Sequence, residues 1–232
     1  AAACGRSGPL RELPPLRYDY LKTLPLNVAT VDIGDAPLPS PIEGQSPVRL
    51  GGAARQMALD RLLAAACRAP SVGLSQPWRF VVVEDQARRQ ALLDLFKACN
   101  SEALTDYSGD RAAHYASLKL AGIAEAPVQL TVFADRGTAV GHGLGRRTMP
   151  EMIDYSVVTA IHTMWLAARA ENIGLGWVSI LDPARVIQIL GVPSDWRLIG
   201  HLCLGYPESE TEVPELERLD WETRLPGREC VL

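Results

Sequence analysis

The stretch of sequence that decides the fold is APSVGLSQPWRF, residues 69–80. It joins a segment with helical periodicity to a short β-branched segment through residues that favour an exposed backbone over packing. Pro70 disfavours helical geometry in the residue before it and so ends the preceding helix. Gly73 removes a side chain where a ligand could approach the backbone. Two hydroxyls and an amide stand nearby, in Ser71, Ser75 and Gln76. These residues alone predict a ligand-binding loop or, equally, a well-capped connection.

Outward from this loop, apolar periodicity predicts helices that alternate with strands. The first helix begins at Met57 and ends before Pro70, and Asp85 and Asp182 are N-cap residues of two later helices. The other predicted helices are residues 86–99, 112–123, about 151–171 and 183–190. The predicted strands are residues 80–83, 127–133, 174–181 and 197–204. This order predicts an α+β fold in which helices flank a mixed central β-sheet.

Two further segments predict loops. Residues 100–110 are polar and predict a mobile loop that could act as a lid. Residues 137–147, GTAVGHGLGRR, contain four glycines but precede no clear strand-to-helix phosphate turn, so they are no dinucleotide-binding fingerprint. We expect a flexible loop there.

The chain divides into two parts by composition. Residues 1–56 are rich in proline and show little sustained periodicity, which predicts an extended or disordered arm. Residues 57–232 hold the apolar periodicity and are expected to form one folded domain. Within it, the helix over about 151–171 carries a continuous apolar face that a second copy of the chain could cover. A homodimer is therefore a hypothesis from the sequence.

Composition excludes several kinds of partner. The net charge of −4 and the lack of a basic block argue against nucleic acid and against an anionic membrane surface. No apolar run is long enough for a membrane span, and no signal-peptide pattern opens the chain. The five cysteines form no CxxC pair, and the four histidines lack the spacing of a metal site. We expect reduced thiols, no metal, a cytoplasmic location and a small-molecule ligand.

The loop of residues 69–80 resembles the signature of the nitroreductase-like flavoproteins. Further stretches resemble their BluB-type branch, namely RTMPEM at 147–152, GWVSILDP at 176–183 and HLCLGYP at 201–207. The resemblance covers roughly residues 59–224. It implies a homodimer that binds FMN as its substrate, with NAD(P)H as the electron source and molecular oxygen as the oxidant. The implied reaction converts reduced FMN to 5,6-dimethylbenzimidazole, the lower ligand of cobalamin. The alternatives are an NAD(P)H-dependent nitroreductase-type FMN oxidoreductase and a catalytically impaired flavin-binding protein.

The candidate site residues follow from this resemblance. Ser179 is the candidate catalytic residue, since its hydroxyl would face the flavin ring and could move a proton. The candidate cofactor-binding residues are Arg49, Ser71, Gly73, Ser75, Gln76, Trp177, Ser179, Gly205 and Arg224. From the residues alone, a hydroxyl within the apolar run 176–181 satisfies backbone groups about as often as it contacts a ligand. Ser179 lacks a GxSxG elbow and is a poor hydrolase nucleophile. Arg224 alone would be taken as a surface charge.

One departure from the family pattern concerns the phosphate. Relatives carry an Arg-Arg-Asp-Val-Arg run before the first core helix, where the arginines grip the FMN phosphate and the aspartate acts as an acid or base. Residues 41–49 here read PIEGQSPVR, so Arg49 is the one cation and Glu43 the one acid. Three explanations follow: an inactive paralogue, replacement by Arg49 and Asp32 from a rearranged arm, or an upstream region translated out of frame.

Overall fold

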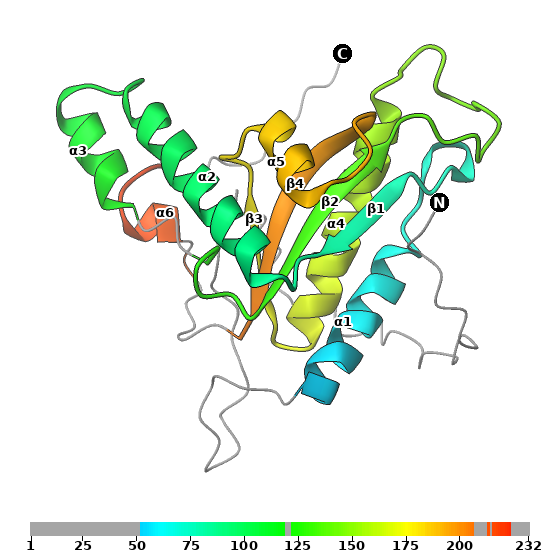
Figure 1. Ribbon diagram of the computed structural model, residues 1–232, viewed down its shortest axis with the longest axis horizontal. Coiled ribbons are helices and arrows are strands. Elements are labelled where there is room, and N and C mark those ends of the chain that lie inside the picture. Colours follow the sequence, from blue (N-terminus) through cyan, green and yellow to red (C-terminus); the bar gives the residue numbers. More distant parts are fainter. Residues whose placement is uncertain (1–51, 119–121, 207–212, 214, 224–232) are drawn as a thin grey trace.

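The computed structural model describes residues 52–118, 122–206, 213 and 215–223, and Figure 1 shows their arrangement. The helices are α1 (Gly52–Ala66), α2 (Gln86–Leu104), α3 (Gly109–Ser117), α4 (Met152–Ala170), α5 (Pro183–Leu190) and α6 (Glu215–Arg218), with a single 3-10 turn, η2 (Val72–Leu74). The strands are β1 (Trp78–Val82), β2 (Val128–Asp135), β3 (Gly174–Val178) and β4 (Trp196–Gly205). No helix within these ranges is both long and apolar enough to cross a membrane.

The four strands form one sheet in the order β1-β2-β4-β3, and every pair of neighbours is antiparallel. The prediction of an α+β, nitroreductase-like fold is confirmed, but the described sheet is not mixed. β2 and β3 run in the same direction. They are not neighbours, because β4 lies between them and runs opposite to both. Sequence periodicity reports the strands and not their order, so it could not reveal this insertion.

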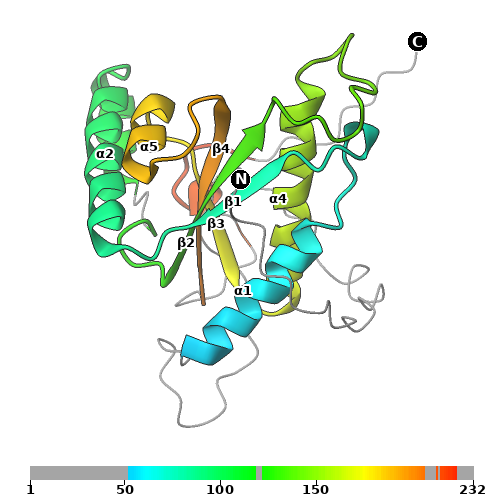
Figure 2. The ribbon, with the colours of Figure 1, turned by 45° about the vertical axis from the view of Figure 1, so that its right-hand side comes forward.

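Helices cover both faces of the sheet, with α1 and α4 on one side and α2 and α5 on the other (Figure 2). On the α4 side, Leu130, Val132 and Leu202 of the sheet are completely buried against the helix. On the α2 side, Phe133 and Val178 pack with apolar residues of α2 and α5. The two clusters share the sheet, whose alternating side chains supply both.

The two predicted N-cap residues are confirmed, but several helices differ in length from the prediction. Asp85 accepts a hydrogen bond from Arg88 N at 2.9 Å, and Asp182 accepts one from Arg185 N at 2.9 Å. α1 begins five residues before the predicted start at Met57. The predicted loop over residues 100–110 is largely wrong, because α2 continues to Leu104 and α3 already begins at Gly109. Most of the polar residues that suggested a loop are exposed, either on the ends of these helices or in the short turn between them.

The α2 face of the sheet also buries polar groups. Thr131 and His201 are opposite each other on β2 and β4, and Thr131 Oγ1 lies 2.9 Å from His201 Nδ1. His201 Nε2 is buried and has no hydrogen-bond partner in the described structure. Burial, and to a smaller extent the charge of Arg89, lowers the pKa of His201 to about 4. The imidazole is therefore neutral in the folded protein at pH 7.

We predict that His201 makes the protein less stable in mild acid. An unfolded histidine takes up a proton near pH 6.5, whereas the folded His201 stays neutral down to about 4. Its contribution to stability is complete above pH 6.5 and is lost as the pH falls toward 4. Between pH 7 and 5, urea unfolding of the wild type should lose about 2 kcal/mol more than that of His201→Gln. Equal losses in the two proteins would contradict the prediction.

Candidate functional site

The loop formed by residues 71–76 is held by its own hydrogen bonds and by α4. Ser71 Oγ accepts a hydrogen bond from Gln76 N at 3.1 Å, which closes the loop. Val72 N donates to Ser156 Oγ at 3.0 Å, and the same hydroxyl donates to Met152 O at 2.6 Å. The loop is thereby tied to the first turns of the helix that lies across the sheet.

The backbone of this loop is unusual for its composition. Gly73 has φ +56°, and Leu74 and Gln76 also adopt positive φ, at 55° and 44°. A left-handed conformation is unfavourable for residues with a Cβ atom, and such residues cluster at functional sites. Leu74 is 70% exposed and Gln76 is exposed as well. The two residues with this strained backbone, Leu74 and Gln76, are exposed and flank the buried Ser75 in the chain.

The glycine-rich segment 137–147 packs directly on this loop. A Cβ atom at Gly73 would lie 2.9 Å from Leu144 O, and one at Gly141 would lie 2.4 Å from Gly73 O. A Cβ at Gly145 would lie 2.7 Å from Val72 Cγ2. The sequence predicted a flexible loop here and an open approach at Gly73. In the structure, these glycines instead allow the backbones of the two loops to come into contact, and Gly73 packs against Leu144.

Ser75 is the polar group that the loop encloses. It is 1% exposed, and its Oγ has no hydrogen-bond partner in the described structure. A buried hydroxyl without a partner costs free energy, on the order of 1–3 kcal/mol. Its position in a strained, glycine-lined loop makes Ser75 a candidate to hydrogen-bond a ligand.

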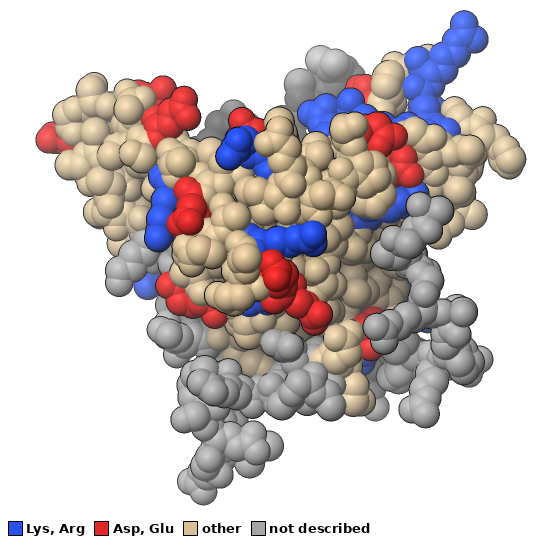
Figure 3. All heavy atoms as spheres, viewed as in Figure 1, with Lys and Arg blue, Asp and Glu red and all other residues tan. Residues whose placement is uncertain are grey.

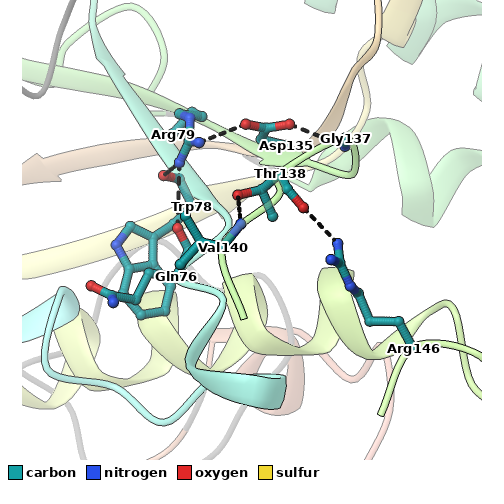
Figure 4. Close-up of polar contacts among 8 residues, drawn as sticks. All are labelled: Gln76, Trp78, Arg79, Asp135, Gly137, Thr138, Val140 and Arg146. Atoms are coloured by element: carbon teal, nitrogen blue, oxygen red, sulfur yellow. Dashed lines mark hydrogen bonds and ion pairs between the residues drawn. The ribbon is translucent and has the colours of Figure 1, made fainter. Parts of the chain in front are cut away.

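Arg79 lies just after the loop, but its charge is already used. Its guanidinium donates to Asp135 Oδ2 at 2.5 Å, to Trp78 O at 2.9 Å and to Gln76 O at 3.3 Å, as Figure 4 shows. Arg146, in the same view, donates to Thr138 O at 2.9 Å. Arg79 therefore stabilises the loop through its hydrogen bond to Gln76 O. Because its charge is paired with Asp135, it is a poor candidate to bind a phosphate.

A second set of ion pairs joins α4 to β4 and to the residue that follows β2. Asp154 accepts hydrogen bonds from both Nε and Nη2 of Arg136, and Arg197 Nε lies 3.6 Å from the same carboxylate. The hydrogen bond to Asp154 raises the pKa of Arg136. Figure 3 shows basic and acidic side chains intermixed over the face that it presents. These arginines are compensated by carboxylates of the same chain.

The other predicted site residues lie elsewhere. Ser179 is the first residue after β3 and is exposed, so it is not inside the strand as the sequence predicted. Trp177 Nε1 donates to Ile199 O at 3.3 Å, and the indole fills the space that Gly200 leaves. β3 forms the sheet edge opposite β1, and three strand spacings of ~4.8 Å separate the two edges.

Gly205 is remote from the loop in the other direction. It ends β4 beside Leu204, which pairs with Val128, whereas Trp78 pairs with Ala134. The six residues from Val128 to Ala134 along β2 correspond to ~20 Å. One copy of the chain thus brings together Ser71, Gly73, Ser75 and Gln76, and keeps Ser179 and Gly205 apart from them. Arg49 and Arg224 lie outside the described residues.

The comparisons with known proteins agree with this architecture. The chain belongs to the nitroreductase family, whose profile matches residues 56–206. A 5,6-dimethylbenzimidazole synthase of Rhodospirillum rubrum is 56% identical over 166 residues, which cover 72% of this chain and 79% of that protein.

Two solved structures share the fold. The crystal structure of oxidized iodotyrosine deiodinase bound to FMN and 3-iodo-L-tyrosine has a TM-score of 0.60 at 20% identity, and the match covers 93% of this chain and 96% of that one. A BluB-like flavoprotein from Clostridium difficile has a TM-score of 0.54 at 19% identity, with coverages of 84% and 94%. At these identities the likeness concerns the fold alone.

Sequence reasoning missed two contributors. Ser156 anchors the 71–76 loop, and the available signal was a lone serine among the apolar residues of the long helix. The glycines of residues 137–147 were noticed, but their contact partner was not. Spacing identifies glycines and gives no information on which backbone approaches them.

We predict that Gly141→Ala destabilises the protein more than Gly143→Ala. Both glycines lie in the same loop with similar φ, +80° and +76°, so both variants carry the strain of a left-handed alanine. Only the Cβ at Gly141 meets neighbouring backbone, because nothing lies within 4 Å of one at Gly143. Urea unfolding should show Gly141→Ala to be less stable by at least ~1 kcal/mol. Equal stabilities would show that the two loops are not packed as described.

Proposed function

We propose that this chain is a 5,6-dimethylbenzimidazole synthase, which converts reduced FMN to 5,6-dimethylbenzimidazole with molecular oxygen. The observation that carries the proposal is the 56% identity to the Rhodospirillum rubrum enzyme over most of both chains. The alternative is an FMN oxidoreductase that leaves its flavin intact. It is favoured by the lack of the Arg-Arg-Asp-Val-Arg run in residues 41–49 and opposed by the lower identity, 30%, to an NADH dehydrogenase of Thermus thermophilus.

The 71–76 loop has suitable chemistry for the neutral parts of FMN. The buried Ser75 hydroxyl lacks a partner, the Gln76 amide is exposed, and the nearby Arg79 is neutralised by Asp135. Such groups suit ring heteroatoms and ribityl hydroxyls better than a phosphate dianion. Bound and reduced, FMN would supply both the electrons for oxygen and the ring carbons of the product. NAD(P)H, or a separate reductase that uses it, would reduce the flavin.

The phosphate needs a cation that is not already paired. Arg79, Arg136 and Arg197 each face a carboxylate of their own chain. A phosphate bound there would have to compete with these ion pairs. Among the arginines expected to bind the cofactor, Arg49 and Arg224 are therefore the ones that we propose for the phosphate.

We further propose that FMN binds between two copies of the chain. The 71–76 loop and the residues Ser179 and Gly205 are too far apart to meet on one protomer, whereas a partner could bring its own set to the loop. Tyr155 and Val158 expose 51% and 38% of their surface on α4, one helical turn apart. Leu74 and Leu144, near the start of the same helix, expose more of their surface, 70% and 71%. This apolar surface is where a partner copy would pack.

Ser179 has a suitable place for a role in the reaction. It is exposed at the end of a strand that is anchored by Trp177, so its hydroxyl is free to meet a ligand without a change in the fold. A serine hydroxyl can both accept and donate a hydrogen bond. In this proposal it passes a proton at the flavin ring while the strand holds it in position.

We predict that Ser179→Ala suppresses product formation with little effect on stability or FMN affinity. An exposed hydroxyl contributes little to folding, and one lost hydrogen bond weakens binding by only ~1 kcal/mol. The assay incubates the protein with reduced FMN and oxygen and identifies products by mass. Turnover should fall at least ~10-fold, whereas Ser179→Thr keeps partial activity and Ser101→Ala, an exposed serine on α2, keeps full activity. Unchanged turnover in Ser179→Ala would remove its catalytic assignment. Oxidation of reduced FMN without the benzimidazole would favour the alternative function.

A shared site predicts complementation between two inactive variants. Gln76→Trp fills the loop with an indole, and Ser179→Ala removes the hydroxyl. If FMN contacts both residues from different protomers, each mixed dimer has one intact site, so random mixing should restore roughly a quarter of the wild-type activity. Mixing requires joint unfolding and refolding, and each variant treated alone is the control. If no activity returns while mixed dimers are demonstrated by mass, both residues act within one protomer and the proposal is wrong.

A further inference from the structure

The α2 face of the sheet carries a small polar cluster inside an otherwise apolar layer. Its members are Gln129 and Thr131 of β2 and His201 and Cys203 of β4, which share this face because residues two apart on a strand point the same way. Gln129 pairs with Cys203, and Thr131 pairs with His201. Gln129 and His201 are therefore diagonal neighbours, a relation in which long side chains can reach one another. Their exposed fractions are 1% and 0%.

The Gln129 amide is oriented by one hydrogen bond. Its Nε2 donates to Ile123 O at 2.6 Å, and since only the nitrogen of an amide can donate to a carbonyl, the positions of its nitrogen and oxygen are fixed. The oxygen, Oε1, is buried and has no hydrogen-bond partner among the described residues. Gln129 thus presents a buried acceptor that requires a donor.

The number of available hydrogen bonds selects the tautomer of His201. The imidazole is neutral at pH 7, so it carries one N–H. If Nδ1 held this hydrogen, Thr131 Oγ1, 2.9 Å away, would accept it, and the threonine hydroxyl hydrogen would have no acceptor in the described structure. With the hydrogen on Nε2, Thr131 donates to Nδ1 and only Nε2–H lacks a partner. The cluster then contains one unpaired donor, on His201, and one unpaired acceptor, on Gln129.

The surroundings of the cluster offer these two atoms little else to bind. Arg89 of α2 lowers the pKa of His201 through its charge, but its guanidinium donates to backbone carbonyls just after β1 and just before β2. Gly176 of β3 lies opposite Cys203 and adds no side chain, which leaves room in that row. The residues that flank or cover the cluster from β1, β3, α2 and α5 are apolar: Val81, Val178, Leu92, Phe96, Val186 and Leu190.

We propose that one buried water molecule binds between the sheet and α2, where it accepts a hydrogen bond from His201 Nε2 and donates one to Gln129 Oε1. A single water can satisfy a donor and an acceptor at once, and internal waters typically bind such unpaired polar groups. The Cys203 sulfur, opposite Gln129, is a weak acceptor for the second hydrogen of the water. The 71–76 loop is tied to α4 on the other face of the sheet, so this site does not depend on FMN and goes beyond the proposed function.

A high-resolution crystal structure of the full chain tests the site directly. We expect one ordered density peak between His201 Nε2 and Gln129 Oε1, at ~2.7–3.2 Å from each atom. A direct hydrogen bond between the two side chains, another protein partner for either atom, or no density between them would overturn the proposal.

Nitrogen NMR of the wild type tests the tautomer and the water together. The Nε2 resonance of His201, assigned by its loss in His201→Gln, should have the chemical shift of a protonated ring nitrogen, and Nδ1 that of an unprotonated one. The buried Nε2–H should also show a cross-relaxation peak to water. Protonation at Nδ1, or an observed Nε2–H signal without a water peak, would contradict the proposed arrangement.

Paired variants test whether the two side chains are linked. In Gln129→Met or His201→Phe the water loses one of its two partners, so the second substitution should lower the melting temperature less when the first is already present. The control combines Gln129→Met with Ser156→Ala, on the other face of the sheet, and its losses should be additive. Additive losses for the Gln129 and His201 pair would show that no shared water joins them. If a variant does not fold, the crystal structure and the NMR of the wild type decide.

Discussion

The packing of α4 across the sheet is the interaction on which the rest of the structure depends. Val157, Ala160, Met164 and Ala168 of this helix are completely buried. Burial of a valine or methionine side chain stabilises a fold by ~1.5–3 kcal/mol, and the two alanines let α1 and the strands come close. The functional loop is attached to the same helix, because Ser156 lies on the buried side of α4 and binds Val72 N. A change in the packing of α4 on the sheet would therefore displace the 71–76 loop as well.

Charge compensation restricts where an anion can bind. At the end of the sheet near the 71–76 loop, Asp135 pairs with Arg79, and Asp154 pairs with Arg136 and Arg197. Partly buried ion pairs of this kind are stable only while both partners remain, since an isolated charge would be left in a poorly solvated place. The arrangement supports a loop that offers neutral hydrogen-bonding groups.

The separation of the candidate residues connects fold to assembly. The strand order puts β1 and β3 at opposite edges of the described sheet, so the width of the sheet separates the loop before β1 from the serine after β3. An active site that needs both is completed by a second copy under our proposal.

The sequence by itself determined the local features. Asp85 and Asp182 as caps, the helix over 152–170, most strand positions and the family itself follow from neighbours in the chain, because capping, periodicity and short motifs are short-range properties. Tertiary structure alone decided the insertion of β4 between β2 and β3 and the contact of Gly73 with Gly141. It also decided the pairing of Arg79 with Asp135, 56 residues apart, which removes that arginine as a phosphate ligand. Each of these contacts joins segments that are distant in sequence. A sequence pattern is local, so it does not reveal which distant backbone or carboxylate will lie next to a given residue.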